Sequence, residues 1–168
     1  AKKYFNLDVG DMYVNRYDRQ VLNDMIDVIR EVKPDFIITH SLDDYHVDHT
    51  ETAALVFNAA FTATLPNYKT KVDDYVKHNI PIFHMEPSIK LDIPNATFIV
   101  DVTNQMETKL KALQCHKTQF VWLGGGEDQT QKILDDTKAQ ARAMGKYGGA
   151  FYGEAFFINR HTQRYVKG

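Results

Sequence analysis

The sequence lacks several features that would place it in a specialised class of protein. It has a single cysteine, Cys115, which excludes an internal disulfide and is compatible with a reducing compartment, so we predict a cytoplasmic location. No apolar run is long enough to predict a membrane span. With 20 basic and 22 acidic residues, it also lacks the positive excess typical of nucleic-acid-binding proteins. Its 168 residues and 43% apolar content predict one globular domain, residues 1–168, without repeats.

Histidine and aspartate, in contrast, are concentrated in one short stretch. Residues 39–50 contain three histidines and three aspartates. The stretch follows an apolar run, residues 36–38, and we predict a short buried strand over residues 36–39. It precedes a predicted helix over residues 50–63. In parallel α/β sheets ligands bind beyond the carboxyl ends of the strands. The sequence therefore predicts an α/β fold with a functional site at this junction.

The centre of this stretch reads Asp44-x-His46-x-Asp48-His49. Imidazole is a common ligand of Zn²⁺ and also suits Fe²⁺, and a nearby carboxylate can bind the metal or orient a bound ring. The same residues also fit a polar loop in which Asp48 and Thr50 cap the following helix. The pattern of residues leaves both interpretations open.

Hydrophobic spacing and capping residues predict the remaining elements. We expect a helix over residues 18–32 with Asp18 as its N-cap, and a helix over 129–144 that stops at Gly145. The other expected elements are one short strand within 1–17, a short helix over 72–77, strands over 80–85, 97–102 and 151–158, a turn over 88–95, a helix over 104–115, a turn over 121–126 and a loosely ordered tail over 160–168.

Residues 33–40, together with Asp44 to His49, resemble the second motif of the LmbE-like (PIG-L) zinc-dependent N-deacetylases. Two later stretches agree: residues 101–119, which end in His-x-Thr-Gln, and residues 152–156, which resemble the Tyr-Ala-Glu-x-Phe of that family. The resemblance covers residues 18–156. It implies a Rossmann-like three-layer α/β sandwich with a mostly parallel sheet.

The chain departs from that family in one respect. Family members begin with a strand that ends in Ala-His-Pro-Asp-Asp-Glu, which supplies two metal ligands and the general base, and this chain has no such motif. His40-Ser41-Leu42-Asp43-Asp44 imitates it, but the spacing is longer by one residue and the proline is missing, so we do not treat the two as equivalent. We therefore expect residues 1–168 to be the C-terminal portion of a longer polypeptide that lacks its N-terminal strand-helix segment, and a metal at His49 only when that segment is present.

The resemblance also implies roles for individual residues. It assigns His49 to the metal and His46 and Asp48 to catalysis. Residues placed around the metal or the substrate are Asp44, His116, Gln119 and Glu154. The implied cofactor is Zn²⁺, with Fe²⁺ as the other candidate, and the implied substrate is a small N-acetylglucosamine-type amino sugar. The aromatic side chain of Trp122 is compatible with a homo-oligomer.

Two other functions remain open from the sequence. One is a non-catalytic α/β binding domain that has lost its metal site. The other is an unrelated metallo-phosphoesterase, in which the histidines and aspartates of residues 44–49 bind a metal with help from His84 or His116. A lone histidine at the end of a strand, such as His84, is more often structural than catalytic.

Overall fold

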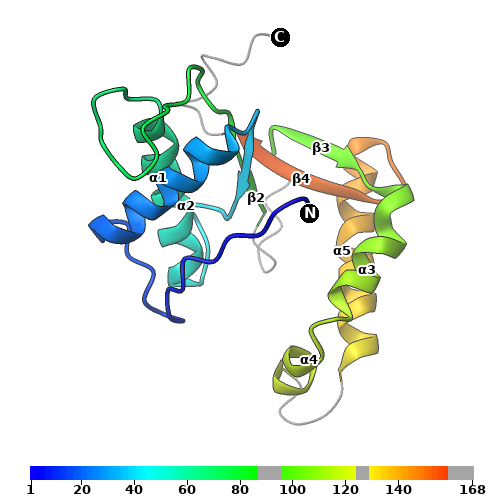
Figure 1. Ribbon diagram of the computed structural model, residues 1–168. Helices are drawn as coiled ribbons and strands as arrows, with labels where there is room; N and C mark the ends of the chain where they lie inside the picture. The colour runs from blue at the N-terminus through cyan, green and yellow to red at the C-terminus, as the bar shows by residue number, and fades with distance from the viewer. Residues whose placement is uncertain (87–95, 124–128, 159–168) are drawn as a thin grey trace. The chain divides into compact units, whose positions relative to one another are not determined.

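A computed structural model of the protein describes residues 1–86, 96–123 and 129–158 (Figure 1). The chain forms two compact units: unit 1 is Ala1–Leu91 with Phe157–Gly168, and unit 2 is Asp92–Phe156. Among the described residues, no helix is both long and apolar enough to cross a membrane. The single domain expected over residues 1–168 stays a prediction.

Unit 1 is built on two helices that pack side by side, α1 (Arg19–Val32) and α2 (Val47–Ala63) (Figure 1). Asp18 caps α1, as predicted, by accepting hydrogen bonds from the main-chain N–H groups of Gln20 and Val21. Small alanine side chains on α2 allow α1 to approach closely. The buried core that these helices form with residues of the chain after α2 includes Ile26, Ile29, Ala59, Ala60, Ala63, Val76, Ile80 and Ile82.

The loop that follows α2 is held by hydrogen bonds to polar side chains of α1. Arg30 is only 1% exposed, and its guanidinium donates to the main-chain carbonyls of Ala63, Leu65, Tyr68 and Val72 and to the Thr70 hydroxyl. The predicted helix over residues 72–77 is wrong, since these residues are not helical. In a helix over these residues the Val72 carbonyl would accept the first intrahelical hydrogen bond, but it accepts from Arg30 instead. The Val72 amide donates to the Asp27 carboxylate.

The strands of unit 1 place the histidine-rich stretch. β1 (Ile37–Thr39) and β2 (Ile82–Met85) pair in parallel, with Thr39 opposite His84. β1 leads into residues 40–46, and α2 begins directly after them, so this half of a parallel α/β unit is confirmed. The expected strand within residues 1–17 is not formed in this described segment, which contains a turn from Gly10 to Tyr13.

Unit 2 is a pair of antiparallel strands covered by helices (Figure 1). β3 (Phe98–Asp101) pairs with β4 (Gly153–Ile158), and Val100 lies opposite Glu154. Its helices are the short 3-10 helix η2 (Thr103–Gln105), α3 (Met106–Leu113), α4 (Lys117–Leu123) and α5 (Thr130–Gly148). Its buried core consists of Met106, Leu110, Leu134 and Ala141.

Gly145 was expected to end α5, but the helix continues to Gly148 and is capped by Gly149, with a φ of 70°. The reason for glycine at position 145 is close packing. A Cβ atom there would lie 2.6 Å from the carbonyl oxygen of Ala150, a distance at which the backbone would have to shift. The predicted turn over 121–126 is helical in α4 as far as Leu123. Three predicted segments lie outside the described residues: the rest of that turn, the turn over 88–95 and the tail over 160–168.

Candidate metal centre

Asp44 organises the loop between β1 and α2. Its side chain is 5% exposed. One carboxylate oxygen accepts a hydrogen bond of 3.0 Å from the main-chain N–H of His46. The other lies 3.1 Å from Nδ1 of His49, which is in the first turn of α2. One carboxylate therefore fixes both the path of the loop and the orientation of the His49 ring.

His46 is the N-cap of α2. Its Nδ1 accepts a hydrogen bond of 3.2 Å from the main-chain N–H of Asp48. α2 begins at Val47 rather than at Thr50, so the alternative interpretation, in which Asp48 and Thr50 cap this helix, does not hold. Because Nδ1 is an acceptor here, the neutral ring of His46 carries its proton on Nε2 and presents a donor there.

Three imidazole rings of unit 1 are stacked. The rings of His40 and His49 are parallel, at 4° and 4.1 Å between centroids. His46 also stacks on His49, with 4.6 Å between centroids and a tilt of 22°. The exposed ring of Tyr45 meets His46 and His49 edge to face. His40 is not among the predicted site residues; the signal that could have found it is its place directly after a parallel strand.

The surroundings favour the protonation states that a metal requires, which are neutral imidazole and ionised carboxylate. Burial, and then the neighbouring His49, lower the pKa of His40. Burial by itself would raise the pKa of Asp44, but hydrogen bonds from His46 and His49 outweigh it and hold this pKa below its ordinary value.

The donor atoms of His40, Asp44 and His49 all lie within 4.8 Å of one another. Two nitrogen or oxygen ligands of a tetrahedral zinc ion lie about 3.3 Å apart, so the three residues can bind one metal only after their donor atoms move closer together. The nitrogen lone pairs of parallel stacked rings lie in separate parallel planes, so joint binding by His40 and His49 requires one ring to tilt. His49 fits best, because Asp44 occupies Nδ1 and leaves Nε2 for the metal.

Asp48, which the resemblance assigns to catalysis, contacts the N-terminal segment of the chain. Its carboxylate accepts hydrogen bonds from the main-chain N–H groups of Met12, at 2.7 Å, and Val14, at 3.2 Å. Next to this contact, Arg16 forms a bidentate ion pair with Glu51. Together these residues fasten the segment 12–16 to the first turn of α2. The catalytic role of Asp48 stays a prediction.

The other predicted site residues belong to unit 2. His116 and Gln119 are exposed at the start of α4, where the Gln119 amide donates to the His116 carbonyl. Glu154 lies on β4 and forms an ion pair with Lys109 of α3. Their place around a metal or a substrate stays a prediction.

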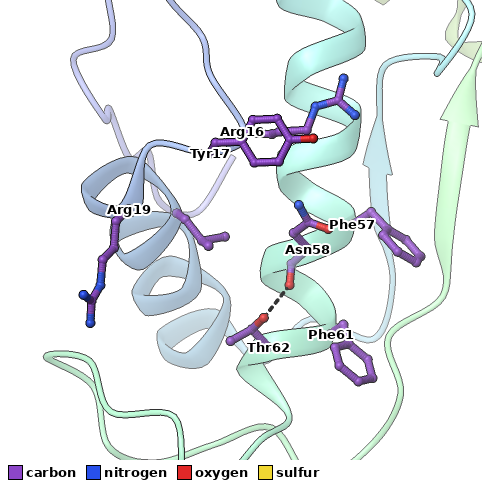
Figure 2. A pocket seen from close by; sticks show the side chains of 8 residues that line it. Arg16, Tyr17, Arg19, Phe57, Asn58, Phe61 and Thr62 are labelled. Carbon is purple, nitrogen blue, oxygen red and sulfur yellow. Dashed lines mark hydrogen bonds between the residues drawn. The ribbon is translucent and has the colours of Figure 1, made fainter.

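A shallow pocket lies along the groove between α1 and α2 (Figure 2). It combines aromatic side chains with two arginines, and its lining residues are Arg16, Tyr17, Arg19, Leu22, Phe57, Asn58, Phe61 and Thr62. None of the predicted site residues lines it. The histidine stack is therefore a separate feature of unit 1.

The family described as GlcNAc-PI de-N-acetylase (PIG-L) matches residues 1–60, which include the whole histidine stack. The resemblance to the LmbE-like (PIG-L) family is confirmed. The chain is 32% identical over 111 residues to the 4-oxalmesaconate hydratase of Pseudomonas putida, covering 64% of this chain and 42% of the relative.

A second curated relative is a deacetylase. Over 130 residues the chain is 30% identical to the diacetylchitobiose deacetylase of Thermococcus kodakarensis, covering 73% of this chain and 46% of the relative. The chain thus spans less than half the length of either curated relative. The crystal structure of the N,N′-diacetylchitobiose deacetylase of Pyrococcus horikoshii matches with a TM-score of 0.69 and 24% identity, over 90% of this chain and 55% of that one. This similarity confirms the predicted α/β fold.

Proposed function

We propose that this chain carries part of the metal site of a zinc-dependent N-deacetylase, which hydrolyses the N-acetyl group of an N-acetylglucosamine-type sugar. The match to the PIG-L family and the similarity to diacetylchitobiose deacetylase support this activity. The observation that carries the proposal is the bond between Asp44 and Nδ1 of His49, because it leaves Nε2 as a metal ligand of fixed direction.

The residues that would hold the metal are His49, oriented by Asp44, and His40, which stacks on His49. Nitrogen and carboxylate donors suit zinc, and Fe²⁺ is also compatible with them. A bound zinc ion supplies Lewis-acid polarisation of an amide carbonyl and lowers the pKa of a water molecule.

His46 supplies the complementary donor. Since its Nδ1 accepts from the Asp48 amide, its Nε2–H can donate to the oxygen on which negative charge develops when water attacks an amide. The ring sits at the N-terminus of α2, whose dipole also favours negative charge there. Both contributions are largest in the transition state, which is where binding energy accelerates a reaction.

The test is release of acetate from N,N′-diacetylchitobiose by the zinc-loaded protein, with and without a chelator. His46→Ala should lower kcat by about 10²–10³-fold, as expected for loss of an oxyanion donor. His46→Gln, which places an amide N–H near the Nε2 position, should retain more activity than His46→Ala. His78→Ala, at an exposed histidine of the same unit, is the control. Acetate release that is unaffected by the chelator and by His46→Ala would contradict the proposal.

A second candidate is addition of water to a carbon–carbon double bond, because the hydratase relative shares 32% identity with this chain. The two functions are separated by substrate. Loss of the ultraviolet absorbance of 4-oxalmesaconate, without any acetate release from the sugar, would favour the hydratase.

A further inference from the structure

His84 is a buried histidine at the end of β2 for which the proposed reaction has no role. It is 5% exposed and lies opposite Thr39 in the parallel ladder. Its Nδ1 is 2.7 Å from the main-chain carbonyl oxygen of His40. A carbonyl only accepts hydrogen bonds, so Nδ1 carries the proton and Nε2 has the lone pair. That Nε2 is also buried, and within the described part of the chain it has no hydrogen-bond partner.

This arrangement is unfavourable for packing alone. A buried nitrogen without a partner lowers stability, and an apolar side chain of similar size would avoid that cost. What the ring provides is a donor at one particular point. The pairing between β1 and β2 ends at Thr39, and the chain leaves the strand at His40. The His84 ring therefore holds the carbonyl of the first residue beyond the strand.

That residue belongs to the histidine stack. The direction of the His40 side chain depends on the backbone at His40, which the bond from His84 restrains. Its ring packs parallel to His49, and the loop that begins there carries Asp44, which orients His49. Each of these contacts depends on where the chain goes as it leaves β1.

We propose that His84 is a positioning residue of the metal centre: by donating from Nδ1 to the His40 carbonyl, it sets the direction in which His40 and the following loop approach His49. It touches neither metal nor substrate in this role. The inference rests on the proposed function only in taking this centre as the metal site.

The experiment compares His84→Asn with His84→Leu in the full chain. An Asn amide N–H lies close to the position of Nδ1, so His84→Asn keeps the donor but leaves a small void. His84→Leu fills the space and removes the unpartnered nitrogen but has no donor. We measure Zn²⁺ affinity by competition with a chelator, and Tm without metal. His84→Leu should weaken Zn²⁺ binding by about tenfold or more, as for other groups that orient metal ligands, while its Tm falls less than that of His84→Asn. His84→Asn should bind Zn²⁺ like the wild type.

Two further variants sharpen the comparison. His84→Gln is similar in size to histidine but places its N–H at the Nε2 position, so it should bind Zn²⁺ as weakly as His84→Leu. His78→Leu is the matched control, because Nε2 of His78 also bonds a main-chain carbonyl, that of Pro34, just before β1. It should leave Zn²⁺ affinity unchanged.

A purely structural role predicts that Zn²⁺ affinity follows Tm across these variants, and that result would overturn the proposal. So would wild-type affinity in His84→Leu. If the wild-type chain fails to bind Zn²⁺, the proposed metal site fails instead. The imidazole ¹⁵N shifts of His40 and His49 in the metal-free protein then decide on His84: they should change in His84→Leu and stay unchanged in His84→Asn, and the absence of any change in His84→Leu would refute the positioning role.

Discussion

Replacing Asp44 with asparagine should weaken metal binding by changing which nitrogen of His49 carries the proton. In the protein, one oxygen of Asp44 accepts from the His46 amide and the other pairs with Nδ1 of His49. An asparagine must keep its oxygen toward His46, because turning it would bring two N–H donors together. Its NH₂ group then faces Nδ1 of His49 and donates to it, so the proton of the ring moves to Nε2.

The expected loss of Zn²⁺ affinity is about 10–100-fold, which is typical for the partner of a metal-binding histidine and corresponds to roughly 1.4–2.7 kcal/mol. Chelator competition measures the affinity, and ¹⁵N NMR of the metal-free protein reports the change of tautomer. Asp43→Asn is the control, since it removes the same charge from the neighbouring, exposed residue. Unchanged affinity in Asp44→Asn, or an equal loss in Asp43→Asn, would refute the reasoning.

Three other predictions concern stability. Asp48→Ala removes the acceptor for the Met12 and Val14 amides, so the free energy of unfolding should fall by about 1–3 kcal/mol and proteolysis near Met12 should become faster than in Asp35→Ala. Hydrogen bonds from the Arg16 side chain and amide hold the pKa of Glu51 at about 2, below its ordinary 4.5. The resulting stabilisation, about 1–2 kcal/mol, is complete above pH 4.5 and is lost as the pH falls toward 2, so an acid titration of Glu51→Gln should lack that part of the pH dependence. Arg30→Met should cost about 3–5 kcal/mol in urea unfolding, because it leaves buried carbonyls without a donor, whereas Arg19→Met at an exposed position should cost little.

Much of the fold could be predicted from the sequence because its signals are local. The apolar spacing of α1, its cap at Asp18 and the strand that becomes β1 all depend on residues close together in the chain. The helix expected over residues 72–77 failed for a reason that is not local. Arg30 and Asp27, more than forty residues earlier, bind the backbone groups of Val72. Gly145 was misread in the same way, since the carbonyl of Ala150 determines its need for glycine.

The candidate site was predictable in its residue types but not in its contacts. The spacing of Asp44, His46 and His49 indicated a metal, and the structure does bring these three together. The tautomers of the rings could not be predicted, because they depend on individual hydrogen bonds such as that from the Asp48 amide to His46. His40 lies in the stack because of the direction in which the chain leaves β1. That direction is determined partly by His84, a residue distant in sequence.

The two candidate reactions make related demands on this centre, which explains how one arrangement of residues can be compatible with both. Attack of water on an amide places negative charge on the carbonyl oxygen. Addition of water to a double bond conjugated with a carbonyl group also places charge on an oxygen atom. The Nε2–H of His46 can donate to either oxygen, because its tautomer is fixed by the helix cap and not by the substrate. Substitution of His46 should therefore lower either activity, and only the choice of substrate can distinguish a deacetylase from a hydratase.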